Sequence, residues 1–180
     1  MKYIALLRGI NVGGKSLIKM AELKTCFEAL GFTNVQTYIN SGNVLFESKV
    51  QPTLKLSKVI EKSIEATFSF PVRVVVINEP DYRTIMQNIP KGWGDKPDWR
   101  YNLLFLIPPY DTEAVMADIG VPKPGIEIIA AGNGVIYQAL EFNSYGRTTG
   151  SKLPSRLSYK TITIRNWNTA RKLLTLLEKV

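Results

Sequence analysis

Apolar residues recur along the first 80 residues with the spacings of short strands and amphipathic helices. In chain order, the pattern predicts a strand at 2–7, a helix at 20–30, strands at 35–39 and 43–48, a helix at 53–68 and a strand at 72–77. The turn Asn40-Ser41-Gly42 between the two middle strands is a strong hairpin signal, and strands joined so closely must be antiparallel. The order β-α-β-β-α-β is that of a ferredoxin-like subdomain.

A similar order of elements begins again after a segment rich in proline and glycine. The second half predicts a strand at 101–107, a helix at 112–119, strands at 126–130, 135–140 and 160–164, and a final helix at about 167–179. Turn residues occupy the place of its second helix. We therefore expect an α+β chain of two ferredoxin-like subdomains in tandem with a C-terminal helix. The expected boundaries are 1–80, a connecting segment at 81–100, and 101–180.

Residues Gly9–Ser16, GINVGGKS, match the phosphate-binding P-loop pattern G-x-x-x-x-G-K-[ST]. A genuine P-loop joins a strand to a helix in a parallel sheet, and an acidic residue at the end of another strand holds Mg²⁺. Here a hairpin follows the helix, Asn78 stands where the acidic residue belongs, and Asp111 comes only after two prolines. We interpret the pattern as coincidental and rank a P-loop nucleotide hydrolase as the least favoured function.

The chain contains no histidine and one cysteine among its 180 residues. Ser-His-Asp and Cys-His couples and imidazole metal ligands are therefore excluded, and no metal site is predicted. Acid–base catalysis would need a carboxylate, lysine or tyrosine with a shifted pKa; Glu47 and Glu141 are candidates, but no spacing selects either. Cys26 lies beside the apolar face of a helix, so we expect an inert packing residue. The sequence identifies no cofactor.

The net charge of +8 lies mostly in residues 147–180, which carry eight basic residues and one acidic residue. Such a cluster fits either an anionic partner or a solvated face that maintains solubility. No apolar run approaches the roughly 20 residues that span a membrane, and the N-terminal run is too short for a signal peptide. We expect a soluble, cytoplasmic protein without membrane association; the oligomeric state stays open.

Two segments combine positive charge with backbone groups that suit an anion. In the first, the glycine-rich loop, glycines permit positive φ and close approach of a ligand; alternatively they only turn the chain. The second opens the last helix, where unpaired amides favour negative groups; alternatively an asparagine simply caps that helix. The candidate anion-binding residues are Arg8, Gly9, Asn11, Gly13, Gly14, Lys15, Arg165, Asn166, Asn168 and Lys172.

The sequence makes one prediction about the second segment and leaves two points open: the role of Trp167 and whether the two segments share a site. We expect Arg165 and Lys172 at the surface. Trp167 is either a core residue or a ring on which a nucleic-acid base stacks. The two segments lie far apart in the sequence, so a shared site requires the two halves to bring them together.

The segments LLRGINVGGKSLIKMAELKTCFEALGF, VQTYINSGNVLF and TIRNWNTARKLLTLL resemble the bacterial family catalogued as domain of unknown function 1697. The resemblance spans essentially the whole chain. It implies an α+β protein of two ferredoxin-like subdomains and not a P-loop hydrolase. It supplies no activity, cofactor or catalytic residue.

Two functions of different classes follow from these observations. The favoured one is a binding module for an anionic, phosphate-bearing ligand, with nucleic acid among the candidates. The alternative is an enzyme in which Lys15 or Arg8 stabilises negative charge and a carboxylate acts as base. Binding ranks above catalysis because the chain lacks histidine and a metal-ligand cluster.

Overall fold

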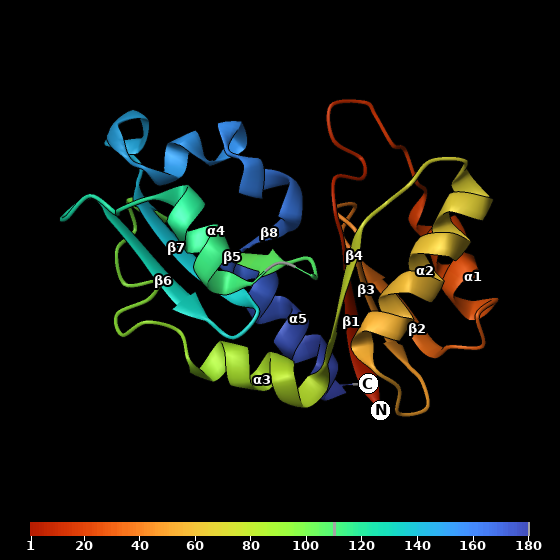
Figure 1. Cartoon of the computed structure of the whole chain (residues 1–180). Coiled ribbons are helices and arrows are strands. Elements are labelled where there is room, and N and C mark those ends of the chain that lie inside the picture. The colour runs from red at the N-terminus through yellow and green to blue at the C-terminus, as the bar shows by residue number, and fades with distance from the viewer. Residues whose placement is uncertain (110, 180) are drawn as a thin grey trace. The chain divides into compact units, whose positions relative to one another are not determined.

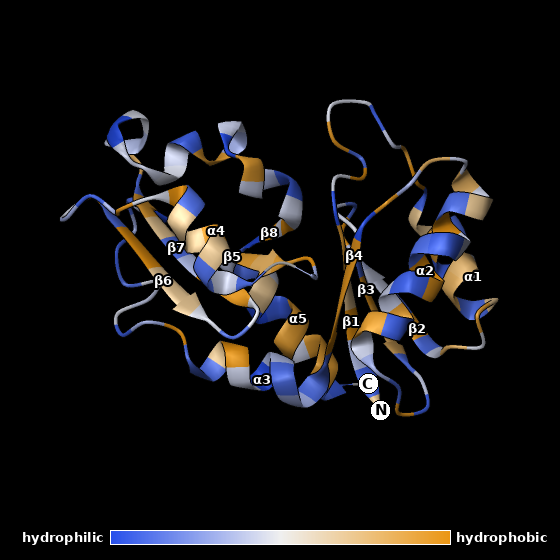
Figure 2. Cartoon of the chain, in the orientation of Figure 1, coloured by the Kyte–Doolittle hydropathy of each residue, from blue (hydrophilic) through white to orange (hydrophobic). Residues whose placement is uncertain are grey.

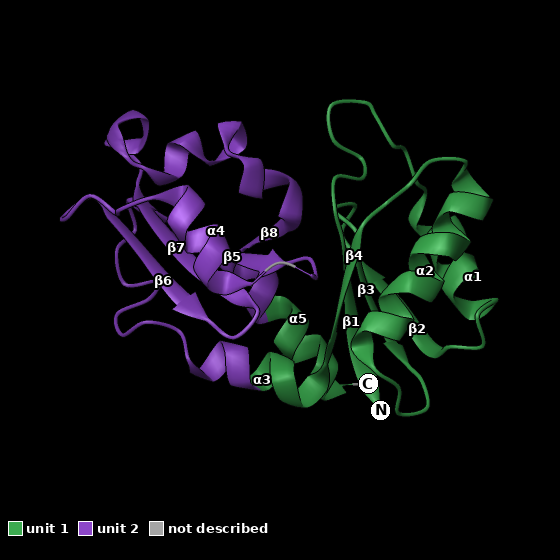
Figure 3. Ribbon diagram, viewed as in Figure 1, with its two compact units in different colours: residues 1–83, 172–180 green, residues 84–171 purple. Residues whose placement is uncertain are grey.

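Two four-stranded antiparallel sheets organise the part of the chain that the computed structural model describes, residues 1–109 and 111–179 (Figure 1). The chain divides into two compact units: unit 1 consists of Met1–Arg83 and Lys172–Val180, and unit 2 of Thr84–Arg171 (Figure 3). None of the helices formed by the described residues is long and apolar enough to cross a membrane.

Unit 1 contains the strands and helices that the hydrophobic pattern predicts. Its elements are β1 (Lys2–Leu7), α1 (Met20–Glu28), β2 (Thr33–Tyr38), β3 (Asn43–Glu47), α2 (Thr53–Phe68) and β4 (Val74–Asn78). The strand order is β2-β3-β1-β4, and each neighbouring pair is antiparallel. Both helices turn an apolar stripe toward one core, while their outer faces are largely polar (Figure 2). Cys26 is buried in that core, with its Sγ 3.1 Å from Ser63 Oγ.

The predicted hairpin joins β2 to β3, where Tyr38 is paired with Asn43. The Asn43 side chain fastens the turn, because its Nδ2 donates to the Tyr38 carbonyl oxygen and to Ser41 Oγ, both at 3.0 Å. Gly42 has a φ of +77°, and a Cβ there would lie 2.7 Å from Leu7 Cβ. Glycine is therefore required, and the antiparallel pairing excludes the parallel sheet of a P-loop protein.

Helix α3 (Glu79–Gln87) extends into residues 81–100, for which the sequence predicts only a connecting segment. Its start is capped by Asn78, whose Oδ1 accepts a hydrogen bond from Asp81 N at 2.8 Å. Pro80 is tolerated because it lies in the first turn, where no helical N–H partner is needed. The residue that stands in place of a magnesium-binding aspartate is therefore a helix cap.

Unit 2 repeats the strand order of unit 1, with β6-β7-β5-β8 and antiparallel pairing throughout. Its elements are β5 (Trp99–Leu106), α4 (Thr112–Ile119), β6 (Glu127–Gly132), β7 (Val135–Glu141), β8 (Ile162–Asn166) and the start of α5 (Trp167–Lys179). Asp111 caps α4: its Oδ1 accepts from Ala114 N at 2.6 Å. A core of Leu104, Ile136 and Val115, among others, lies between the sheet and α4.

Three short 3₁₀ segments replace the second helix of unit 2, at Tyr145–Arg147, Gly150–Ser155 and Leu157–Thr161. The buried carboxylate of Glu127 holds this region to β6. It accepts hydrogen bonds from the backbone N–H groups of Lys123 at 2.7 Å, Thr149 at 2.8 Å and Gly150 at 3.0 Å. The carboxylate therefore pairs backbone N–H groups in a region that has no second α-helix to pair them.

The last turns of α5 belong to unit 1. There, Arg83 Nη1 donates to Glu178 Oε1 at 2.9 Å, and Lys2 Nζ donates to the Leu177 carbonyl oxygen at 3.0 Å. The helix begins directly after β8, without an intervening loop. This junction between β8 and α5 positions the site described below.

Candidate functional site

The glycine-rich loop joins β1 to α1 and ends in a tight turn. Gly13 and Gly14 have φ values of +58° and +76°, and Lys15 N donates to the Val12 carbonyl oxygen at 3.1 Å. Helix α1 begins only at Met20. In a P-loop the Lys-Ser pair opens the helix, so that helical amides face the phosphates. The loop therefore lacks P-loop geometry.

Asn11 stabilises this loop from within. Its Nδ2 donates to the carbonyl oxygens of Ile18 at 3.0 Å and Asn40 at 2.9 Å, and its Oδ1 accepts from Ile18 N at 2.8 Å. Gly9 and Lys15 are exposed, whereas Arg8 is half-buried. The loop thus presents a cation and exposed backbone, and anion binding by it stays a prediction.

Arg165 is buried, so the expectation that it lies at the surface is wrong. It is 5% exposed and pairs across the sheet with Leu103, which is fully buried. Residues paired in this way point to the same face of a sheet, so Arg165 points into covered space. Its Nη1 donates to Thr163 Oγ1 at 2.9 Å and to the Ile164 carbonyl oxygen at 2.8 Å. Lys172 is exposed, as expected.

Asn166 caps α5, because its Oδ1 accepts from Thr169 N at 2.8 Å. Trp167 is half-buried and Asn168 is exposed. Of the candidate residues, Arg165, Asn166 and Asn168 belong to unit 2, whereas the glycine-rich loop and Lys172 belong to unit 1. A site shared by the two segments stays a prediction.

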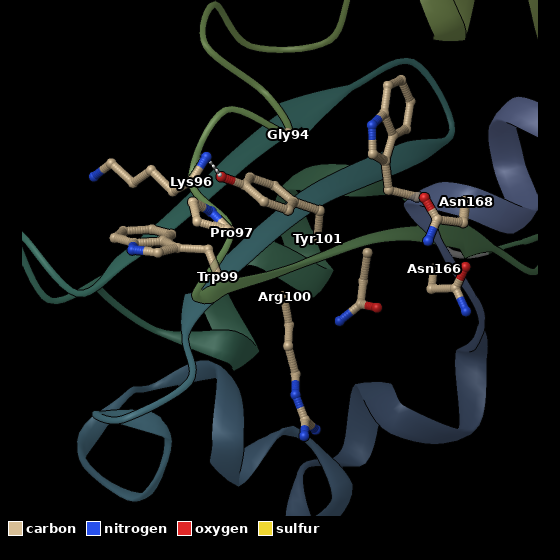
Figure 4. A pocket seen from close by; sticks show the side chains of 10 residues that line it. Gly94, Lys96, Pro97, Trp99, Arg100, Tyr101, Asn166 and Asn168 are labelled. Atoms are coloured by element: carbon tan, nitrogen blue, oxygen red, sulfur yellow. Dashed lines mark hydrogen bonds between the residues drawn. The ribbon is translucent and has the colours of Figure 1, made fainter.

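A pocket of about 550 Å³ lies within unit 2, where the start of β5 meets the start of α5. Figure 4 shows Lys96, Trp99 and Tyr101 on one side and Asn166 and Asn168 on the other. We call it the β5–α5 pocket. Its lining residues are Gly94, Lys96, Pro97, Trp99, Arg100, Tyr101, Asn102, Asn166, Trp167 and Asn168.

The pocket exists because β8 ends opposite Asn102, so that the first residues of β5 extend beyond the end of β8. Asn102 pairs with Asn166 in the last register position, after which the chain turns into α5. Ile107, the residue after β5, donates its backbone N–H to the Thr161 carbonyl oxygen, which lies on the β8 side of the strand. Every second residue back along β5 directs its backbone N–H and C=O to the same side, and Tyr101 is one of these residues. Tyr101 therefore turns its backbone N–H and C=O toward the unpaired edge. Ligands can meet main-chain and side-chain groups there together.

Aromatic packing supports one wall of the pocket. Trp93 is buried, with its ring centre 5.1 Å from that of Tyr101 and 6.0 Å from that of Tyr137. The Tyr101 hydroxyl accepts a hydrogen bond from Lys96 N at 3.1 Å. These contacts fix the loop that precedes β5, so this wall is formed before any ligand binds.

Gly94 and Trp167 meet at the edge of the pocket. Gly94 has a φ of +91°, and a Cβ there would lie 3.0 Å from Trp167 Nε1. Glycine permits both the backbone conformation and the close approach of the indole. Trp167 is therefore a wall of the pocket rather than a core residue.

The pocket is lined by cations and amides without any acidic side chain. The Lys96 ammonium lies 4.1 Å from the centre of the Trp99 ring. The Arg100 side chain is exposed, and Asn102 Nδ2 donates to Gln138 Oε1 at 3.2 Å. Asp95 and Asp98 flank Lys96 in the sequence but do not line the pocket. This lining suits an anionic ligand with a planar group.

Two carboxylates and one tyrosine of unit 2 have shifted pKa values, and all three residues lie outside the lining of the pocket. Burial acts to raise the pKa of Glu127, but its hydrogen bonds from backbone N–H groups outweigh burial and leave the pKa below its ordinary value. Hydrogen bonds from Ser158 lower the pKa of Asp118. Burial raises the pKa of Tyr137, whose hydroxyl donates to the Ile85 carbonyl oxygen at 2.7 Å. These groups secure the fold.

The two carboxylates considered as catalytic bases also lie elsewhere. Glu47 is half-buried on β3 in unit 1, and Glu141 Oε2 accepts a hydrogen bond from Ser144 Oγ. Among residues 1–109 and 111–179, no group of three or more His, Cys, Asp and Glu side chains could hold a metal ion.

Sequence reasoning selected Asn166 and Asn168 but missed the other side of the pocket, from Lys96 to Asn102. A signal was present: in KPDWRYN the rings of Trp99 and Tyr101 alternate with Arg100 at the start of a strand. Residues two apart in a strand point to the same face, and two aromatic rings on one face are typical of a surface on which bases stack.

Comparison with known proteins gives a family and a fold. A family model described as protein of unknown function (DUF1697) matches residues 1–137. The chain is similar to a solved structure of the conserved bacterial protein SP0830 from Streptococcus pneumoniae, with 31% sequence identity, 98% of each chain covered and a TM-score of 0.86. Curated proteins give no match. The chain therefore belongs to the DUF1697 family, as its sequence motifs suggested.

Proposed function

We propose that the protein is a binding module for an anionic, phosphate-bearing ligand and that the ligand occupies the β5–α5 pocket. The observation that carries this proposal is the composition of the lining: two cations, three aromatic rings, three amides and no carboxylate. The volume of about 550 Å³ lies within the range of ordinary small-ligand pockets.

Each group has a chemical role in this proposal. Lys96 and Arg100 attract the phosphate, and the positive end of the α5 helix dipole, at Trp167, adds to this attraction. The half-buried rings of Tyr101 and Trp167 offer apolar faces to a base or sugar. The amides of Asn102 and Asn168 can donate and accept hydrogen bonds. A nucleotide has a counterpart for each: a phosphate for the cations, a base and a sugar for the rings, and hydrogen-bonding atoms for the amides.

Catalysis is not part of the proposal, because no lining residue can act as a carboxylate base. Neither Glu47 nor Glu141 is among the lining residues. Binding alone accounts for the combination of charge, rings and amides.

We also infer that both units are ferredoxin-like. Unit 1 has the full β-α-β-β-α-β order, and unit 2 keeps the same strand order with 3₁₀ segments in place of its second helix. A cytoplasmic location fits the one cysteine of the chain, Cys26, which is buried as a free thiol.

Thermal-shift measurements at low salt test the proposal. The probes are inorganic phosphate, ribose 5-phosphate, AMP and UMP, with uridine as the uncharged comparison. A ligand that binds the folded state raises its midpoint of unfolding, by about 2.7 kcal/mol of stability at 100 times the Kd. We expect AMP or UMP to raise the midpoint more than phosphate or uridine alone, and the effect to shrink as salt rises.

Variants locate the site. Lys96→Ala and Asn168→Ala should abolish most of the nucleotide-induced shift, whereas Lys49→Ala, an exposed lysine of unit 1, should leave it unchanged. If Lys15→Ala removes the shift and Lys96→Ala does not, the ligand binds the glycine-rich loop and the pocket proposal is wrong. The absence of any shift with all four phosphate probes would reject it outright.

A further inference from the structure

An exposed aromatic surface continues from the β5–α5 pocket along unit 2. Phe142 and Tyr145 are the exposed aromatic residues of the described chain, at 53% and 40%. The Arg100 guanidinium carbon lies 4.4 Å from the ring centre of Phe142 and 5.8 Å from that of Tyr145. Arg100 also lines the pocket. We call Arg100, Phe142, Tyr145 and Arg147 the aromatic–arginine surface.

Hydrogen bonds fix this surface before any ligand binds. Phe142 N donates to the Asp98 carbonyl oxygen at 2.8 Å, and Arg147 N donates to that of Ser144 at 2.8 Å. The buried Ser144 Oγ donates to Glu141 and accepts from Arg147 Nη2 at 2.6 Å. Exposed rings held in one place bind flat partners with little loss of conformational entropy.

We propose that the protein binds single-stranded nucleic acid, with one nucleotide in the β5–α5 pocket and its neighbours stacked on the aromatic–arginine surface. This inference rests on the pocket binding a nucleotide, as proposed above. It adds that the ligand is a polymer.

The chemistry of the surface favours an unpaired strand. A guanidinium packed on a ring forms a flat, positively charged platform, on which a base stacks while the next phosphate pairs with the cation. A duplex hides the faces of its bases, so it cannot use Phe142 or Tyr145. Phe142 has no hydrogen-bonding group, so the surface should accept any base and show little sequence preference.

The extent of the surface favours more than one nucleotide. Phe142 and Tyr145 lie outside the lining of the pocket, while Arg100 belongs to both. A mononucleotide in the pocket leaves the two rings exposed to solvent. A strand that passes Arg100 covers them.

Fluorescence anisotropy with a labelled oligouridine of about ten nucleotides tests this inference. UMP, which reports on the pocket alone, is titrated in parallel by calorimetry. We expect the oligouridine to bind at least about tenfold more tightly than UMP, because each stacked base adds affinity. A duplex of equal length and polyglutamate, which has the charge without bases, should bind more weakly than the oligouridine.

Variants of the exposed rings separate the two proposals. The double variant Phe142→Ala/Tyr145→Ala should raise the Kd for oligouridine by about tenfold or more and leave that for UMP unchanged. Leu157→Ala, which alters an 83% exposed apolar residue of the same unit, should change neither. Phe142→Leu keeps apolar bulk without the ring and provides a gentler variant should the double variant fold poorly.

The outcomes distinguish one failure from the other. If UMP binds but oligouridine binds no more tightly, or if the double variant binds oligouridine like the wild type, the polymer inference is wrong and the pocket proposal stands. If oligouridine does not bind, the polymer inference is wrong, and if none of the four phosphate probes binds either, both proposals are wrong. Equal affinity for polyglutamate or for the duplex would show that charge alone is recognised and would overturn the inference.

Discussion

Glu127 anchors the region of unit 2 in which 3₁₀ segments replace the second helix. Glu127 is 4% exposed, and its carboxylate accepts three backbone hydrogen bonds from two separate segments. A glutamine cannot replace it, because one of its two polar atoms is a donor that would face backbone donors. We expect Glu127→Gln to lower the free energy of unfolding at neutral pH by about 1–3 kcal/mol, measured by urea denaturation.

The same carboxylate should make stability depend on pH. Its pKa is lowered in the folded state, so the stabilisation is present above the ordinary glutamate pKa. It is lost as the pH falls through the folded-state pKa. Between neutral pH and pH about 3, the wild type should therefore lose more stability than Glu127→Gln. The exposed substitution Glu65→Gln should follow the wild-type profile; parallel profiles for all three proteins would contradict this role.

Arg165 owes its burial to its register position opposite Leu103. Its guanidinium is hydrogen-bonded inside the protein, so its removal leaves buried acceptors without a partner. We expect Arg165→Ala to lower the free energy of unfolding by about 1–3 kcal/mol, and Lys172→Ala, at an exposed site, to change it by less than about 0.5 kcal/mol. Equal denaturation midpoints for the two variants would contradict the assignment.

At the scale of elements, the start of α5 has one capping residue and one that lines the pocket without capping. Asn166 Oδ1 accepts from Thr169 N, and Asn168 is exposed two residues later. We expect Asn166→Ala to cost about 1 kcal/mol of stability and Asn168→Ala to have little effect on it. Both should weaken nucleotide binding. A stability loss confined to Asn168→Ala would place the cap elsewhere.

The helices and strands were largely predictable, because their apolar positions follow a clear period. The predicted hairpin and antiparallel pairing are present, and α2 and α4 have the predicted bounds. Helix α3 was missed because the prolines and glycines that follow it, at Pro90, Gly92, Gly94 and Pro97, favoured a connecting segment over 81–100. Its buried face consists of Tyr82, Ile85 and Met86.

At the scale of the whole molecule, the pocket could be predicted only in part. Asn166 and Asn168 were candidates because they lie at a helix N-terminus, but the residues that line the pocket opposite them come from the start of β5 and the loop before it. The register that pairs Asn102 with Asn166 brings these segments together, and no local pattern specifies it. The direction of Arg165 was unpredictable for the same reason.

The P-loop pattern should have no hydrolytic consequence. The sheets are antiparallel, α1 begins after the Lys-Ser pair, and Asn78 caps a helix. We expect no Mg²⁺-dependent release of phosphate from ATP or GTP above a protein-free control. Turnover that disappears in Lys15→Ala and persists in the exposed control variant Lys49→Ala would revive the hydrolase.

The location of the ligand is tested most directly by nuclear magnetic resonance of nitrogen-15-labelled protein titrated with AMP and then with UMP. The three tryptophans, Trp93, Trp99 and Trp167, give separate indole signals that single Trp→Phe variants assign. We predict that the Trp167 and Trp99 signals shift in a saturable manner, while the amides of Gly13 and Gly14 do not. Shifts in the two glycine amides without any change at Trp167 and Trp99 would contradict the account and place the ligand on the glycine-rich loop.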